Sequence, residues 1–94
     1  MKCYHATSGL AAEKIEKFGF KDGTGSYMTD QSHTGVWIAD RPLDENDGAI
    51  SEALFEIEID EADIAGFEWI EEGKAFREFL VPAAILNRHP RQRL

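Results

Sequence analysis

The segment 52–60 alternates between apolar and acidic residues, and this alternation constrains the fold more than any other feature of the sequence. Phe55, Ile57 and Ile59 are apolar, and an acidic residue follows each of them. Successive side chains of a β-strand point to opposite faces of the sheet. The pattern therefore predicts a strand with one face packed on a core and the other in water, which is typical of an antiparallel sheet.

One helix is predicted near the N-terminus, at residues 8–18. Thr7 or Ser8 can cap its first turn by accepting a hydrogen bond from a free backbone N–H, and Gly19 is suited to end it. We expect its apolar stripe, which recurs at helical spacing, to pack on the sheet: Ala11, Ile15 and Phe18.

Further strands are predicted where short apolar runs end at turn residues, at 2–5, 35–39, 67–70 and 76–81. Residues 21–34 predict a loop with a short extended piece around Tyr27 and Met28, and residues 43–48 a loop or one helical turn. One helix after the first strand and several strands after it predict an α+β fold with a mostly antiparallel sheet. We expect a single domain over residues 1–87.

The charge of the chain is unevenly distributed. The net charge is −8, and residues 88–94 hold Arg88, Arg91 and Arg93 without an acid, so residues 1–87 carry −11. A body this acidic repels nucleic acid. The basic C-terminal tail 88–94 is expected either to fray in water or to touch an acidic surface.

Cysteine content and hydropathy point to a protein of the cytoplasm. The single cysteine, Cys3, excludes an internal disulfide, which fits a reducing compartment. No apolar run is long enough to span a membrane, and the first residues do not predict a signal peptide.

Three residues have the chemistry of a site. His5 ends the first strand and could bond a ligand hydroxyl, or it could be a half-buried histidine tied to the backbone. Trp37 lies in an apolar strand and could stack on a planar ring or simply fill the core. Glu78 shares a strand face with apolar residues, which is costly unless the carboxylate is paired or works in a site. The pairing alternative is an ion pair with Arg41 or Lys74.

Other chemistries are poorly supported by the sequence. The histidines and Cys3 lack metal-ligand spacing, so we expect no metal. No nucleophile elbow is present. The acidic residues of segment 56–63 are most simply a solvated face.

Three segments together resemble the ADP-ribosyltransferase-like superfamily. The first is the strand Tyr4-His5-Ala6-Thr7, followed by a helix that closes in Gly19-Phe20. The second is the strand 35–40, which is similar to the family's strand of glycine, apolar and aromatic residues. The third is Glu78-Phe79-Leu80-Val81-Pro82, which resembles the strand that opens with the family glutamate. The string 35–48 is similar to that of small bacterial and phage proteins of this type.

The resemblance implies a split pair of small antiparallel sheets with a cleft that holds NAD. His5 would bond a ribose hydroxyl, the backbone of Ala6 would meet the nicotinamide amide, and Trp37 would stack on the nicotinamide ring. Glu78 would bind the 2′-hydroxyl of the nicotinamide ribose. Thr7 and Arg41 are further candidates for contacts with NAD.

The implied activity is NAD-dependent ADP-ribosyl transfer or NAD glycohydrolysis, with Glu78 and His5 as catalytic residues. The partners would then be NAD, as substrate, and a protein acceptor. Phe76 stands where arginine-modifying members carry a second acid, so the resemblance does not extend to arginine as acceptor. The alternative function is that of a non-catalytic acidic binding or inhibitor protein that occupies a basic partner surface. One form of this alternative is a phage-encoded inhibitor.

Overall fold

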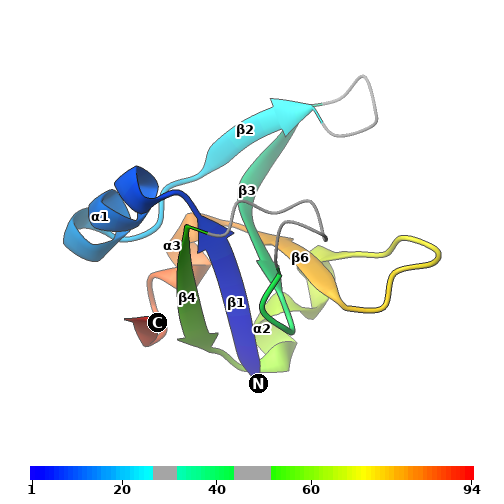
Figure 1. Ribbon diagram of the computed structural model, residues 1–94. Coiled ribbons are helices and arrows are strands. Elements are labelled where there is room, and N and C mark those ends of the chain that lie inside the picture. Colours follow the sequence, from blue (N-terminus) through cyan, green and yellow to red (C-terminus); the bar gives the residue numbers. More distant parts are fainter. Residues whose placement is uncertain (27–31, 44–51) are drawn as a thin grey trace.

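The computed structural model describes residues 1–26, 32–43 and 52–94 (Figure 1). The predictions for Tyr27, Met28 and residues 44–48 lie outside these ranges. In chain order the elements are β1 (Lys2–Thr7), α1 (Gly9–Phe18), β2 (Gly23–Ser26), β3 (Ser32–Ala39), β4 (Ala53–Glu58), α2 (Glu61–Ile64), the 3-10 turn η2 (Ala65–Phe67), β5 (Glu68–Trp69), β6 (Glu78–Val81), α3 (Ala83–Leu86) and β7 (Arg91–Arg93). The fold is α+β, as predicted, with one antiparallel sheet and a few short helices.

The sheet has the strand order β5-β6-β3-β1-β4-β7 in the described part of the chain, and β2 pairs with β3 outside this path. β1 pairs with β4 along its whole length, from Lys2 opposite Glu58 to Thr7 opposite Ala53. Its pairing with β3 is limited to Tyr4 opposite Ala39. The resemblance implied two separate small sheets. The structure instead has one sheet that is split where β1 and β3 diverge.

The split follows from a change of partner along β3. Residues 32–35 of β3 pair with β2, and residues 36–39 pair with β6. Gly35 stands at this change with φ of 150°, a conformation that favours glycine. Figure 1 shows the β2–β3 hairpin rising away from the end of β1, with α1 beside it.

The core lies on one face of the sheet, which we call the pocket face and define by Cys3, His5 and Thr7 of β1. The register with β4 places Phe55 and Ile57 on the same face, and both are buried. Residues of α1, α2 and α3 complete this core: Ala12, Ile15, Ile64, Ala83 and Leu86. The alternation that predicted β4 is therefore confirmed, because its apolar positions are the buried ones.

The helix α1 begins and ends where predicted, but its buried face differs. Ser8 caps it by accepting a hydrogen bond from the N–H of Ala11 at 3.1 Å, and Gly19 ends it with its N–H bonded to the carbonyl of Ile15. The expectation that Phe18 packs on the sheet is wrong, because 83% of its surface is exposed. Ala12 is buried instead, so the helix is rotated about its axis relative to the predicted stripe.

The C-terminal segment is part of the sheet, so the expectation of a fraying tail is wrong. Residues 91–93 form β7 and pair with β4, with Arg91 opposite Ile57. Arg91 also donates a hydrogen bond to the carbonyl of Ile15 at 3.0 Å, and Arg93 pairs with Glu16. The basic residues of this segment therefore hold α1 to the edge of the sheet. No helix in the described ranges is long and apolar enough to cross a membrane.

Candidate ligand pocket at the split of the sheet

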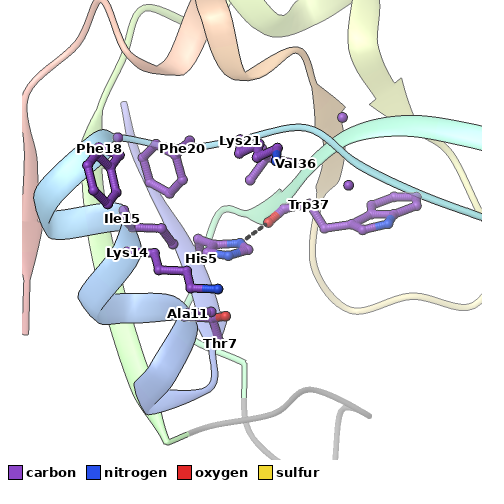
Figure 2. Close-up of a pocket in the computed structure, with 13 residues that line it drawn as sticks. His5, Thr7, Ala11, Lys14, Ile15, Phe18, Phe20, Lys21, Val36 and Trp37 are labelled. Atoms are coloured by element: carbon purple, nitrogen blue, oxygen red, sulfur yellow. Dashed lines mark hydrogen bonds between the residues drawn. The ribbon is translucent and has the colours of Figure 1, made fainter.

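A pocket with a volume of about 590 Å³ occupies the space where the sheet splits. α1 and the turn after it form one wall, the end of β1 forms the floor, and Gly23, Gly35 and Val36 form the opposite wall. Figure 2 shows the imidazole of His5 at the centre of these residues. The size lies within the usual range for small-molecule sites, about 300–1,000 Å³.

His5 joins the two sides of the split. Its Nδ1 lies 2.7 Å from the backbone oxygen of Trp37. A carbonyl oxygen can only accept, so Nδ1–H donates and the neutral ring keeps a free acceptor at Nε2. The ring also packs edge-on against Phe20, with centroids 5.6 Å apart. β1 and β3 have separated at this level, so the side chain of His5 bonds a β3 carbonyl next to the gap.

The surroundings of His5 keep the ring neutral. Burial lowers its pKa below the ordinary value, and the hydrogen bond to Trp37 only partly offsets this. A neutral imidazole whose Nδ1–H is already committed offers one lone pair to a ligand. It is thus fitted to accept a hydrogen bond from a hydroxyl or an N–H group.

The two residues that follow His5 on β1, Ala6 and Thr7, lie on opposite faces of the sheet. Thr7 is two residues further along the strand, shares the pocket face and lines the pocket. Ala6 lies between them, pairs with Leu54 of β4 and does not line this pocket. A ligand in the pocket can therefore meet the side chains of His5 and Thr7.

Trp37 lines the pocket, but its indole leaves it. Tyr4 and Ala39 are directly opposite each other, so the side chain of Trp37 lies on the same face as Tyr4, opposite to His5. The indole packs edge-to-face against Trp69 of β5, with centroids 5.4 Å apart. Figure 2 shows it pointing away from the pocket residues on α1. The stacking surface that we expected beside His5 is on the other side of the sheet.

Glu78 lies on the same face as the two tryptophans. It is opposite Ala39 on β3 and opposite Trp69 on β5. We call this the tryptophan face and define it by Trp37, Trp69 and Glu78. Glu78 is not among the residues that line the pocket. The prediction that His5, Trp37 and Glu78 all line one cleft is therefore wrong, because the register puts His5 on the opposite face.

The carboxylate of Glu78 has a partner, as one alternative from the sequence predicted. The ammonium of Lys74 bonds it and also lies 2.9 Å from a carboxylate oxygen of Glu71. Burial lowers the pKa of Lys74, but the hydrogen bonds to Glu78 and Glu71 raise it more, and the net shift is upward. The charge of Glu78 is thus compensated, and only 15% of its side chain is exposed.

Two arginines near residues 76–77 lie outside the pocket. The guanidinium of Arg41 lies 4.8 Å from the ring centre of Phe76, and Arg41 does not line the pocket. Arg77 forms a forked pair with Glu68 at 2.7 and 3.2 Å. It also bonds Glu61 of α2. Arg77 therefore ties α2 and β5 to the segment just before β6.

The lone cysteine is not suited to chemistry. Cys3 is fully buried. Burial and the carboxylate of Asp40 raise the pKa of its thiol to about 11, so the reactive thiolate is scarce. Within the described ranges, no group of histidine, cysteine and acidic side chains is arranged to hold a metal ion.

Comparisons with known proteins add no relative. No protein-family model matches the chain, and neither a search of curated proteins nor a search of solved structures finds a similar protein. The candidate function therefore rests on the residues and geometry described above.

Proposed function

We propose that this domain binds NAD in the pocket at the split of the sheet and cleaves its nicotinamide–ribose bond, by transfer to an acceptor or by hydrolysis. The observation that carries the proposal is the state of His5: a neutral imidazole, fixed through Nδ1, whose Nε2 is free inside the pocket. A ribose hydroxyl is the hydrogen-bond donor that such a nitrogen requires. The motif resemblance assigns His5 the same partner.

The rest of the pocket suits a dinucleotide. Its walls include the apolar residues Ile15, Phe20 and Val36, against which flat rings can pack. Thr7 adds a hydroxyl next to His5. The volume of about 590 Å³ falls in the range of sites that enclose most of a small ligand.

Cleavage requires a charged group that binding alone does not require. Breaking the bond between nicotinamide and ribose builds positive charge on the sugar, which a fixed carboxylate stabilises. Glu78 is the proposed carboxylate. It lies on the tryptophan face, outside the pocket, in an ion pair with Lys74. Cleavage therefore requires that the nicotinamide ribose reaches across the split of the sheet to this face and that Lys74 releases the carboxylate. The two halves of the proposal therefore depend on different residues and can be tested apart.

Calorimetric titration with NAD tests the binding half. His5→Asn keeps an amide N–H near the position of Nδ1, where it can still bond the Trp37 carbonyl, but lacks the Nε2 acceptor. We expect NAD to bind roughly 3–10 times more weakly to this variant, the usual value of one hydrogen bond. The matched control is His89→Asn, because His89 pairs with Asp63 and does not line the pocket. Equal affinities for wild type and His5→Asn would refute the role of His5.

Release of nicotinamide tests the cleavage half. Glu78→Gln keeps the shape and removes the charge, so we expect NAD affinity to persist and the rate to fall by about a hundredfold or more. Glu71→Gln, which alters the other acid on Lys74, is the control and should keep most of the rate. Trp37→Ala should lower affinity and rate together if the indole stacks on the ligand. If the wild type binds NAD but releases no nicotinamide with any acceptor, the domain is the binding module that the sequence offered as its alternative.

A further inference from the structure

The wall of the pocket that α1 forms carries side chains to which the motif resemblance assigns no role. They are Lys14 and Phe18 on the helix and Lys21 after it. Phe18 exposes 83% of its surface, although burying a phenylalanine is worth about 1.5–3 kcal/mol. An exposed aromatic ring at the rim of a pocket is available to pack against a ligand.

The charge of this wall is opposite to that of the protein. The chain has a net charge of −8, yet the residues that line the pocket include two lysines and no acid. Lys14 and Lys21 form no ion pair with any residue that the structure describes, whereas Lys2 and Lys74 are each paired with glutamates. Figure 2 shows the side chain of Lys14 running along the pocket toward His5. The pocket therefore places near His5 two positive charges without an ion-pair partner among the described residues.

We propose that the α1 wall is a recognition subsite for a nucleoside diphosphate. Lys14 and Lys21 bind the phosphate oxygens, and the ring of Phe18 packs on the face of the base. Phosphate supplies the negative charge that two unpaired ammonium groups require, and a base supplies the flat apolar surface that an exposed phenylalanine lacks. This inference rests on the proposed function only in placing the ligand in the same pocket. The ligand can be a free nucleoside diphosphate or that part of a dinucleotide.

Titration of the wild type with ADP and with adenosine is the direct test. We expect ADP to bind at least tenfold more tightly than adenosine at low salt. This advantage should shrink as salt is raised, because the charged contacts are exposed. Inorganic pyrophosphate should bind more weakly than ADP, because it offers nothing to Phe18.

Substitutions separate the charges from the ring. Lys14→Gln and Lys21→Gln should each weaken ADP about fivefold or more and leave adenosine unchanged. Lys17→Gln is the matched control, since Lys17 lies on the same helix, is exposed and does not line the pocket. Phe18→Ala should weaken ADP and adenosine by a similar factor. Its control is Leu10→Ala, another exposed apolar residue of α1 outside the pocket wall.

The outcomes distinguish this inference from the proposed function. If ADP binds no better than adenosine, or if Lys14→Gln and Lys21→Gln bind ADP like Lys17→Gln, the subsite is refuted even where NAD is cleaved. If pyrophosphate binds as well as ADP, the role of Phe18 is refuted. Lysine-dependent ADP binding without nicotinamide release would support the subsite and refute the cleavage. All substituted side chains are exposed, so the variants should remain folded, and circular dichroism checks this.

Discussion

The two edges of β1 differ in how far they are paired with their neighbours. Along one edge, six residues pair with β4, and Cys3, Phe55 and Ile57 of this pairing are buried in the core. Along the other edge, a single residue pairs with β3, and a side chain, His5, forms the next connection. The same strand thus belongs to the core on one edge and to a pocket on the other. The comparison shows that the candidate site arises where strand pairing stops.

The largest expected effect concerns the paired edge. Phe55 lies opposite His5 on β4, is 1% exposed and packs edge-on against Phe20. Phe55→Ala should lower the free energy of unfolding by about 3–5 kcal/mol, because it leaves a cavity in the core. Chemical denaturation measures this loss. Phe18→Ala removes the same ring from a water-exposed position and should change stability by less than about 0.5 kcal/mol. Similar losses of stability for the two variants would mean that the paired edge of β1 is no better packed than the rim of the pocket.

A smaller effect is expected where β3 changes partner. A Cβ on Gly35 would lie 3.1 Å from Leu80 and from the carbonyl oxygen of Val81, and φ of 150° strains any residue with a Cβ. Gly35→Ala should therefore cost about 1–3 kcal/mol and disturb the pocket wall. Gly66→Ala is the control, because nothing lies within 4 Å of its Cβ position. If Gly35→Ala were as stable as the wild type, the bend of β3 would not depend on glycine.

The smallest effect belongs to His5 and depends on pH. Its pKa is lowered in the folded protein, so between that pKa and the ordinary value of about 6.5 the unfolded chain binds more protons. The contribution of His5 to stability is therefore complete above about pH 6.5 and is lost as the pH falls toward the lowered pKa. Denaturation at pH 7.5 and 5.5 should show a larger drop for the wild type than for His5→Asn. An equal drop in both proteins would mean that His5 is not held neutral by the fold.

The elements of the fold could be predicted from the sequence because their signals are local. The alternation of β4, the Ser8 cap and the Gly19 stop of α1 depend on residues within one strand or one helical turn. The small strand β2 and the pairing of residues 91–93 were missed, because a glycine-rich strand and an arginine-rich strand carry no apolar alternation.

The arrangement of the candidate site could be predicted only in part. The sequence pointed to His5 and to an unusual carboxylate at Glu78, since both stand out within their own strands. Whether two residues on different strands share a face depends on the register between strands, which is set by contacts far apart in the chain. Tyr4 opposite Ala39 decides that Trp37 and Glu78 lie on the face away from His5. The α1 wall was missed because an apolar stripe predicted that Phe18 would be buried.

Asn87 holds the turn that carries this wall, and it does so with both ends of one amide. Its Oδ1 accepts from the N–H of Phe20 at 2.8 Å, and its Nδ2 donates to the carbonyl of Phe20 at 2.9 Å. Aspartate has almost the same shape but no donor, so its second oxygen would face the Phe20 carbonyl and repel it. Slow hydrolysis of this amide during storage would therefore replace the hydrogen bond to the Phe20 carbonyl with a repulsion and loosen the pocket wall, although the side chain keeps its size. Ligand binding would then be lost over time through a change at Asn87, which does not line the pocket.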